Sequence, residues 1–335
     1  MSEPAATTDT PAVRIVIVNY NAGEHLKRCL DCLQKQTFTD FEAVVIDNAS
    51  TDGSHIDALP DDNRFRLTVL KENIGFAAAN NLGTKDCRAP WIAALNPDAF
   101  AEPDWLENLL KATQRYSNAT MFGSTQINAN DSNMLDGTGD AYFIFGLAWR
   151  GNHGRPINEL PETGETFSPC AAAALYKTTA FQDAGGFDER FFCYLEDVDL
   201  GFRLRLRGER CIQVREAVVH HVGAVSAGAK SDFERFHSTR NNLWLFIKNM
   251  PGLSFWLFLP GHIALQIVWL IWNTLGGRFR PTWQGFISAL KELPRVWRER
   301  AAVQSARSVS AMTLLRALTC SPLKLLCRKD NVLGP

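Results

Sequence analysis

Short apolar runs alternate with helical patterns through the first hundred residues of the chain. The runs are rich in Val and Ile, which is typical of strands that are buried on both faces. Strands are predicted at residues 13–19, 41–46, 66–70 and 91–95, and helices at residues 24–36 and 73–83. Strands that alternate with helices form a parallel sheet, so this part of the chain predicts an α/β fold.

The pattern weakens in the middle of the chain and then recovers. Residues 123–168 are rich in Gly, Asn and Asp, and they predict loops with short strands. Further strands are predicted at residues 171–176, 211–214 and 217–220, and further helices at residues 178–184 and 196–207. Gly208 follows the last of these helices, at the position where a Gly commonly ends a helix.

A long uncharged segment comes next. Residues 249–277 contain no Asp, Glu, Lys or Arg, and residues 253–275 are mainly aromatic and aliphatic. This stretch meets the requirement of about 20 apolar residues for a membrane-spanning helix, although Pro260 and Gly261 interrupt it. Three interpretations remain open: a segment that lies on or re-enters the membrane, one that spans it, and a helix packed against another subunit.

The composition is that of a folded protein with an uneven distribution of charge. The chain has 335 residues, 46% hydrophobic and 21% charged, which excludes a disordered chain, a collagen-like repeat and a small disulfide scaffold. Residues 278–330 hold eleven basic and three acidic residues, a net charge of +8, whereas the whole chain carries −1. The remainder therefore carries −9, and a basic tail on an acidic body predicts an anionic partner such as a membrane surface. No basic stripe with interleaved aromatic residues occurs in the main body, so a nucleic acid partner is not expected.

The eight cysteines lack the paired spacing of a zinc site. Cys29 and Cys32 lie on one face of a predicted helix, so buried thiols in a reducing cytosol are expected, with redox or metal binding as the alternative. The N-terminus lacks the apolar segment of a secretion signal, and residues 1–11 are predicted to be a disordered leader.

Six sequence blocks in a fixed order carry a resemblance to a known family. They are VIVNYN at 16–21, VIDNASTDGS at 45–54, NIGFAAANNLG at 73–83, LNPDA at 95–99, GGFDERFFCYLEDVDLGFRLRLRG at 185–208 and VVHHVGAVS at 218–226. Together they resemble the family 2 inverting glycosyltransferases, especially the bacterial rhamnosyltransferase-like branch. The resemblance covers about residues 13–250.

The resemblance implies a fold and a function. It implies a GT-A domain over residues 12–245, Rossmann-like with a mainly parallel sheet and flanking helices, followed by a helical membrane-associated region over residues 246–335. The implied reaction moves a sugar from a pyrimidine nucleotide donor, dTDP-L-rhamnose or else a UDP-hexose, with inversion at the anomeric carbon. A polyprenyl-linked or glycan acceptor, cell-surface polysaccharide synthesis and a place on the cytoplasmic side of the membrane follow, with a homo-oligomer left open. The alternative is a module that binds a nucleotide sugar without turning it over.

Candidate donor-binding residues follow the predicted strands. Asp47 ends a strand and is suited to accept the imide N–H of uracil or thymine, with capping of the next turn as the alternative. Asn19 and Asn21 follow the first strand and are expected to line the same pocket. Asn48, which follows Asp47, is a further donor-binding candidate. By resemblance, the segment that contains Asn73, Gly75, Asn80 and Asn81 is expected to lie against the ribose and diphosphate, with a turn glycine as the alternative for Gly75.

For the diphosphate, the family generally uses an Asp-x-Asp pair that holds Mg²⁺ or Mn²⁺. Here the position reads Asn96-Pro97-Asp98, so Asp98 is the expected direct ligand and Asn96 is expected to bind the metal or the ribose. An imidazole from His220 or His221 is expected to add a ligand, and only one of them can point to the metal because neighbouring strand residues face opposite ways. His220 is preferred from its place in the family's pattern, and the nitrogen ligand slightly favours Mn²⁺ over Mg²⁺.

The proton of the acceptor hydroxyl requires a general base. Glu196, Asp197 and Asp199 lie at the start of a predicted helix, where acidic residues also complement the helix dipole. By likeness to the family's Glu-Asp pair, Asp197 is the expected base and Glu196 orients the acceptor or replaces Asp197 as the base. Asp199 and Arg203, four residues apart, are expected to form a structural ion pair.

Two weaker candidates complete the predicted site. Asp188 follows a tight Gly-Gly turn and is expected to face the donor or acceptor sugar. Arg240 is expected either to reach the donor phosphates, which suits a guanidinium, or to pair with a neighbouring acid.

Overall fold

Four parallel strands form one half of the central sheet in this computed structural model, which describes residues 10–223 and 231–334. They are β1 (Val13–Asn19), β2 (Phe41–Asp47), β3 (Phe65–Val69) and β4 (Trp91–Leu95). They pair in the order β4-β1-β2-β3, and all of these pairs are parallel, as the alternation of apolar runs and helices predicted. The predicted leader lies, up to residue 9, outside the described residues.

The second half of the sheet mixes strand directions. β11 (Ala173–Lys177) runs antiparallel to both β4 and β6 (Met121–Asn128), and β12 (Cys211–His221) runs parallel to β6. The edge strands are β5 (Ala99–Ala101), β7 (Leu135–Gly137) and β10 (Gly164–Thr166). The sheet is therefore mixed, and its parallel part is confined mainly to the N-terminal half.

Two predicted boundaries in this half are wrong. The strands predicted at 211–214 and 217–220 are one strand, β12, with an irregularity in register between Val214 and Val218. The segment predicted as loops with short strands begins at residue 123, whereas β6 begins at Met121 and is a central strand of the sheet. Its polar residues Ser124, Thr125 and Gln126 are buried. Burial of polar residues removes the apolar run by which a strand is recognised in a sequence.

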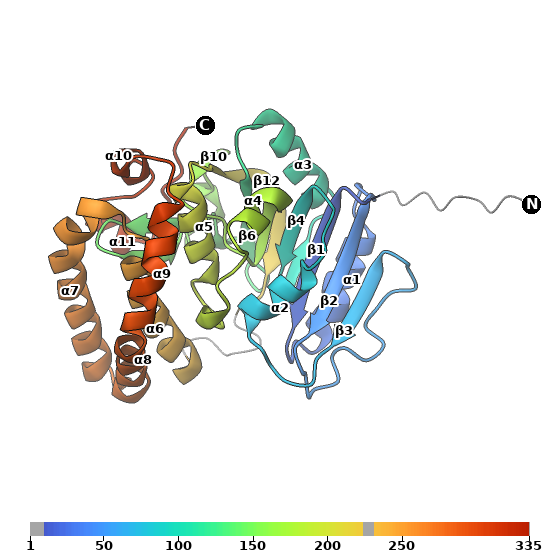
Figure 1. The fold of residues 1–335 in the computed structure, drawn as a ribbon. Coiled ribbons are helices and arrows are strands. Elements are labelled where there is room, and N and C mark those ends of the chain that lie inside the picture. The colour runs from blue at the N-terminus through green and yellow to red at the C-terminus, as the bar shows by residue number, and fades with distance from the viewer. Residues whose placement is uncertain (1–9, 224–230, 335) are drawn as a thin grey trace, which may run out of the picture.

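Helices cover both faces of the sheet (Figure 1). α1 (Glu24–Gln34) and α3 (Trp105–Arg115) bury their apolar residues in the core on one face. α2 (Phe76–Gly83), α4 (Thr178–Asp183) and α5 (Glu196–Leu206) pack on the other face. α1 forms there because Leu26, Cys29, Leu30 and Leu33 recur at helical spacing and are fully buried.

A short hairpin stands apart from the main sheet. It consists of β8 (Asp140–Phe143) and β9 (Leu147–Arg150). Two 3-10 turns, Ile157–Glu159 and Glu189–Phe191, lie in the loops that follow it in sequence.

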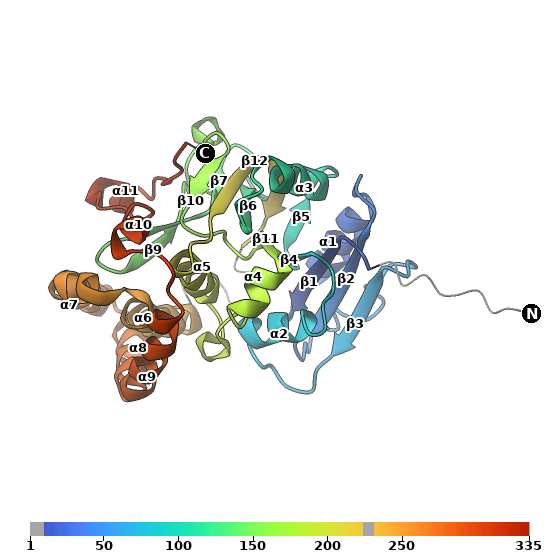
Figure 2. The same ribbon diagram turned by 45° about the horizontal axis from the view of Figure 1, so that its top comes forward.

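The C-terminal helices pack beside this hairpin and α5. They are α6 (Asp232–Asn249), α7 (Gly252–Leu275), α8 (Phe279–Lys291), α9 (Leu293–Ser305), α10 (Ala311–Leu315) and α11 (Pro322–Leu326). Figure 2 shows them gathered at the end of the molecule opposite β3. The expected boundary at residues 245 and 246 falls inside α6.

One apolar core joins both parts of the chain. Tyr142, Phe167 and Phe202 from the first part pack in one cluster with residues of the C-terminal helices, including Phe246, Phe255, Val296, Leu314 and Leu318. The chain end also returns to the sheet, where Leu333 pairs with Glu165 of β10. The C-terminal helices therefore complete a core of the α/β part.

Candidate active site

The carboxyl ends of β2, β1 and β4 meet at one edge of the sheet. Asn19 pairs in register with Asp47, and Asn96 follows directly after β4, which is β1's other neighbour. The main-chain N–H of Asn96 donates to the carbonyl of Ala172, which ties this edge to the start of β11. Three of the predicted donor residues thus lie along one edge, where ligands bind in open α/β sheets.

Asp47 is enclosed by its own neighbours. It is fully buried, and Oδ1 accepts a hydrogen bond from Nδ2 of Asn19 at 2.7 Å while Oδ2 accepts one from the N–H of Ser50 at 3.0 Å. Nδ1 of His55 lies 3.5 Å from Oδ1. These contacts agree with the alternative role of Asp47, which is to cap the turn that follows. A direct hydrogen bond from Asp47 to a nucleotide base would require these loops to move apart.

The remaining amides shape the loops of the same edge. Oδ1 of Asn21 accepts from the N–H of Thr51 at 2.8 Å. Asn48 donates to Oδ1 of Asn73 at 2.9 Å, and the same oxygen accepts from the N–H of Gly75. Asn80, buried in α2, donates to the carbonyl of Phe76 at 3.0 Å, so its amide is used within the helix.

Gly75 is required where two loops meet. It has φ +89°, and a Cβ at this position would lie 2.8 Å from the carbonyl oxygen of Phe192. The left-handed backbone and the close approach both favour Gly. Gly75 therefore holds the loop before α2 against the loop before α5.

Asp98 and His221 face each other at this edge. Nε2 of His221 lies 3.3 Å from Oδ1 of Asp98 and 3.3 Å from Nδ2 of Asn96. Oδ2 of Asp98 accepts from the N–H of Gly223 at 3.0 Å. Burial alone raises the pKa of Asp98, but the hydrogen bond and charge of His221 outweigh it, so the net pKa is lowered.

The preference for His220 does not agree with the structure. His220 lies on the other side of β12, where its Nε2 is 2.7 Å from Oε1 of Glu102 and its side chain is 30% exposed. His221 is 3% exposed and lies against Asp98. Because neighbouring residues of β12 face opposite sides of the sheet, His221 reaches the site and His220 does not.

Asp136, a residue that sequence reasoning missed, holds the other side of His221. Its Oδ2 lies 2.7 Å from Nδ1 of His221 and 2.5 Å from Nη1 of Arg150, and its Oδ1 lies 3.3 Å from Nδ1 of His153. Burial lowers the pKa of His221, but the hydrogen bonds to Asp136 and Asp98 outweigh this effect and raise it. Asp136 and Arg150 lie in the segment predicted as loops with short strands, where no sequence pattern identified them as site residues.

The residues around Asp98 fit part of a divalent metal site. A carboxylate oxygen and an imidazole nitrogen face each other, and both are ligands of Mn²⁺. Within residues 10–223 and 231–334 there is no group of three or more His, Cys, Asp or Glu placed to hold a metal ion. The protein's own ligands are therefore too few for a closed site, which is usual where substrate phosphates and water supply the other oxygens.

Asp197 lies at the first turn of α5 and is tied to the same edge. Its Oδ2 accepts from the N–H of Ala171 at 2.9 Å, and Ala172 in turn binds Asn96. Its Oδ1 accepts from the N–H of Val198 at 2.8 Å. Burial raises the pKa of Asp197, and the two N–H groups and the charge of Arg150 oppose that rise only in part.

Two further acidic residues, Glu196 and Asp140, interact electrostatically with Asp197. Glu196 is buried, and its Oε2 has no hydrogen-bond partner; burial and the charge of Asp197 raise its pKa well above the usual range. Asp140 is also buried, with Oγ of Ser168 at 3.4 Å from its Oδ2, and burial and Asp197 raise its pKa. The site thus holds several acids in a poorly solvated volume, which favours shared protons.

Asp188 and Arg240 serve structural contacts. Asp188 is paired with Arg190 and with Nζ of Lys248, the latter at 2.6 Å, and Arg190 and Lys248 together lower its pKa against the effect of burial. Arg240 donates to the carbonyls of Arg190 and Phe191 at 3.0 and 2.9 Å. In the described part of the chain neither contacts Asp98 or His221, and their sugar-facing and phosphate-binding roles stay predictions.

The predicted ion pair within α5 is present. Nε of Arg203 lies 2.7 Å from Oδ2 of Asp199. Lys248 lies 2.9 Å from the same carboxylate, so α5 and α6 are joined by buried charges.

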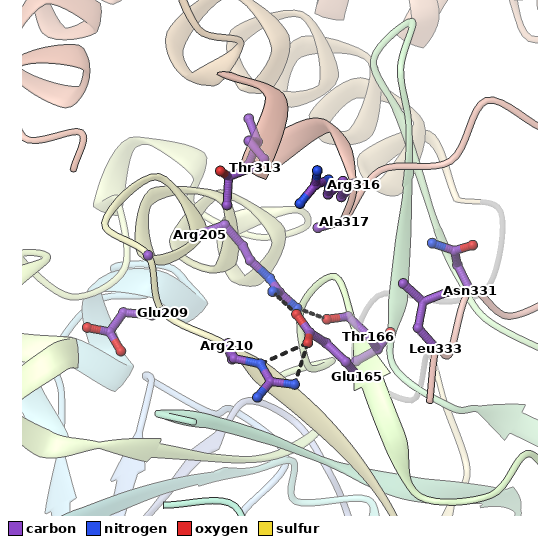
Figure 3. Close-up of a pocket in the computed structure, with 12 residues that line it drawn as sticks. Glu165, Thr166, Arg205, Glu209, Arg210, Thr313, Arg316, Ala317, Asn331 and Leu333 are labelled. Carbon is purple, nitrogen blue, oxygen red and sulfur yellow. Dashed lines mark hydrogen bonds and ion pairs between the residues drawn. The ribbon is translucent and has the colours of Figure 1, made fainter. Parts of the chain in front are cut away.

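A pocket of about 340 Å³ lies away from this edge, between β10, the end of α5 and α10 (Figure 3). Glu165 pairs there with Arg205 and with Nη2 of Arg210, the latter at 2.7 Å. None of the residues that line this pocket is Asp98, Asp197 or His221, so the pocket is not the candidate site.

Known proteins are similar to this chain in sequence and in fold. A family model described as "Glycosyl transferase family 2" matches residues 14–185. The N-acetylglucosaminyl-diphospho-decaprenol L-rhamnosyltransferase of Mycobacterium tuberculosis is 30% identical over 242 residues, which cover 65% of this chain and 78% of that protein.

Solved structures show the same fold at low identity. S. aureus TarS 1–349 in complex with UDP has a TM-score of 0.55 at 16% identity and covers 90% of this chain and 88% of its own. GalNAc-T7 with UDP, GalNAc and Mn²⁺ has a TM-score of 0.56 at 15% identity and covers 72% of this chain and 48% of its own. These likenesses confirm the predicted GT-A type of fold.

Proposed function

Because the chain belongs to glycosyl transferase family 2, as its six blocks predicted, we propose that it transfers a sugar from a nucleotide donor with inversion at the anomeric carbon. One observation supports this proposal above the others. Asp197, Asp98 and His221 come from three separate segments and are linked to one edge of the sheet. Such an edge suits a reaction in which a leaving diphosphate and an attacking hydroxyl meet at one carbon.

Asp197 is the proposed general base. Its carboxylate is held by two main-chain N–H groups, so the side chain is fixed before an acceptor binds. Its raised pKa brings it nearer to the pH at which a base works best. In the proposed step, Asp197 takes the proton of the acceptor hydroxyl while that oxygen attacks the anomeric carbon from the face opposite the nucleotide. Glu196 remains the rival for this role.

Asp98 and His221 are the proposed holders of the diphosphate side. A divalent metal bound there, Mn²⁺ or Mg²⁺, would neutralise charge that develops on the leaving diphosphate. Asp136, which is itself paired with Arg150, keeps Nδ1 of His221 occupied, so Nε2 is the nitrogen directed at Asp98. Asn19, Asn21, Asn48 and Asn73 are proposed to shape the nucleotide pocket through the loops that they organise.

The proposed donor is dTDP-L-rhamnose, with a UDP-hexose as the second choice. The proposed acceptor is a sugar carried on a polyprenyl diphosphate. Support comes from the mycobacterial relative, whose name describes rhamnosyl transfer to N-acetylglucosaminyl-diphospho-decaprenol. A role in cell-surface polysaccharide synthesis follows. Since nucleotide sugars are cytosolic, we place the active site on the cytoplasmic side of the membrane.

The substitution Asp197→Asn tests the function and the base together. We expect turnover to fall by about 10²–10⁴-fold, because the amide cannot accept the proton. The measurement is release of nucleoside diphosphate from dTDP-, UDP- and GDP-sugars, with Mn²⁺ or Mg²⁺ and vesicles that carry a polyprenyl diphosphate sugar.

Asp61→Asn, at an exposed carboxylate, is the matched control and is expected to leave turnover unchanged. A larger loss in Glu196→Gln than in Asp197→Asn would transfer the role to Glu196. Donor binding by calorimetry without release from any donor would favour the binding module.

A further inference from the structure

The polar and apolar faces of α7 are the reverse of those on a surface helix of a soluble protein, which turns its apolar face to the core. Its polar side chains Ser254, His262, Gln266 and Asn273 are buried against the protein. Nε2 of Gln266 donates to Oδ1 of Asn242 on α6 at 2.7 Å, and Nδ1 of His262 lies 2.9 Å from the carbonyl of Phe145. The side that faces the protein is therefore the hydrogen-bonding side.

The outer face of α7 is apolar along its whole length. Its exposed side chains recur three and four residues apart, which places them on one stripe. They are Leu253, Trp256, Leu257, Ile263, Ile267, Val268, Ile271, Trp272 and Leu275, each at least 50% exposed. A contiguous apolar stripe of this size marks an interaction surface.

The helix is continuous through Pro260, so the break expected at Pro260 and Gly261 is absent. Gly261 instead allows the hairpin to approach, since a Cβ there would lie 2.5 Å from Cδ1 of Phe145. α7 is long and apolar enough to cross a membrane by length and composition alone.

A second exposed apolar group lies beside α7. Leu323 and Leu326 of α11 are 71% and 79% exposed. Leu325 of the same helix and Leu265 of α7 both pack against the cluster of the β8–β9 hairpin. Both views place α7 and α11 at the same end of the molecule (Figures 1 and 2). We define the exposed stripe of α7 with Leu323 and Leu326 as the lipid face.

Basic residues surround the lipid face. Arg278 and Arg280 follow the C-terminal end of α7 and are exposed. Arg307 lies near its N-terminal end, where Nη1 would be 4.0 Å from a Cβ at position 252. Arg328 and Lys329 follow α11. Apolar side chains flanked by cations complement an anionic bilayer, in which lipid tails meet negative headgroups.

We propose that α7 lies flat in the interface of an anionic bilayer, with the lipid face in the acyl region and the polar face on the protein. A spanning orientation would carry α6 and α8, which pack along α7, into the hydrocarbon or strip α7 of its polar partners. The flat orientation keeps every one of these contacts.

The flat orientation also sets the distance between the active site and the lipid. The hairpin begins at Asp140, beside Asp197, and its tip at Phe145 contacts the inner side of α7. Five residues reach at most about 18 Å, and a helix is about 10–12 Å thick. Asp140 is therefore at most on the order of 30 Å from the lipid, which suits an acceptor anchored in the same leaflet; this step alone rests on the proposed function.

Flotation of the full-length protein with preformed vesicles tests the proposal without donor, acceptor or metal. We expect binding to phosphatidylglycerol–phosphatidylcholine vesicles, weaker binding to phosphatidylcholine alone, and weakening by salt. The double variant Ile267→Glu/Ile271→Glu should lower the partition coefficient at least about tenfold, because two charges enter the acyl region.

The matched control is Ile56→Glu/Val69→Glu, two exposed apolar positions far from the lipid face in sequence and fold. It should float like the wild type. Equal flotation of the two double variants would overturn the proposal. A second result would also overturn it: light scattering shows a dimer without lipid, only Ile267→Glu/Ile271→Glu dissociates that dimer, and flotation of this variant is unchanged. The lipid face would then be a contact between two copies of the chain.

The exposed thiol of Cys320 distinguishes a flat helix from a spanning one. Cys320 follows α7 in sequence, so in a Cys327→Ser variant, which removes the other exposed thiol, a membrane-impermeant maleimide added outside should label Cys320 of vesicle-bound protein if α7 lies flat. Protection of Cys320 until detergent is added would show that α7 spans. These outcomes do not depend on catalysis, so failure of the transferase proposal would leave them interpretable.

Discussion

Strand geometry separates the roles of two adjacent histidines. His221 lies between Asp98 and Asp136, whereas His220 faces Glu102 on the other side of β12. The sequence identified these two histidines as the candidates for the metal ligand. Only one of them can face the site, because neighbouring strand residues face opposite ways. The sequence did not show which of the two reaches the site, because that depends on which face of β12 lies on the side of Asp98 and Asp136.

Substitution of each histidine tests this assignment. His221→Ala is expected to weaken Mn²⁺ binding by at least about tenfold in the presence of nucleoside diphosphate, since a ligand is lost. His220→Ala is the control and should change it less than twofold. The measurement is Mn²⁺ titration followed by electron paramagnetic resonance. Equal losses in the two variants would contradict the assignment.

Asp136→Asn tests how His221 is held. The amide keeps the shape of the side chain but loses the charge that orients the imidazole. We expect Mn²⁺ affinity to fall by about 10–100-fold, the usual effect of removing such a partner. Unchanged affinity would show that Asp136 serves only Arg150 and His153.

The pH dependence of turnover reports on Asp197. Its pKa is raised by burial, so its charged, active form is lost on acidification at a higher pH than for an ordinary Asp. kcat/KM should therefore fall on the acidic side with an apparent pKa higher than that of an ordinary Asp. Arg150→Met should move this limb to still higher pH, because Arg150 favours the charged form of Asp197.

At the scale of elements, buried charges join α5 to α6. Lys248 is 3% exposed and pairs with Asp188 and Asp199, while Arg203 and Asn249 complete the contacts of Asp199. α6 also holds the loop before α5, because Nδ2 of Asn241 donates to the carbonyls of Phe191, Cys193 and Tyr194. The position of α5, and with it that of Asp197, thus depends on α6.

Lys248→Met should lower the free energy of unfolding. It leaves two buried carboxylates with fewer partners, so we expect a loss of about 3–5 kcal/mol in the free energy of unfolding. Lys291→Met, on the exposed side of α8, should change it by less than about 0.5 kcal/mol. The measurement is urea unfolding followed by circular dichroism.

The same network has a definite pH dependence. Burial raises the pKa values of Asp188 and Asp199, but neighbouring cations outweigh this effect and lower both. The stability that these carboxylates contribute is present above their unfolded pKa and is lost as pH falls through the lowered folded values. Lys248→Met should therefore unfold at a higher pH than the wild type in an acid titration.

For the whole molecule, the C-terminal helices complete a shared core. Tyr142, Phe167 and Phe202 pack with Phe246, Phe255 and Leu318, so removal of residues 250–335 would expose large apolar surfaces of the α/β part. We expect the shortened chain to aggregate or to bind a hydrophobic dye strongly. A cooperative thermal transition equal to that of the full chain would contradict this view of a single core. Loss of membrane binding in the shortened chain would therefore say little about α7.

The sequence by itself determined the alternation of strands and helices in the first hundred residues, the family, and the presence of Asp98 and Asp197 near strand and helix ends. Each of these depends on local periodicity or on short blocks, which are readable along the chain. Only the tertiary structure decided that Asp136 supports His221, that Asp188 pairs with Lys248, and that the polar face of α7 points inward. These features arise from contacts between segments far apart in sequence, and burial of polar residues, as in β6 and α7, hides them from any hydrophobic pattern.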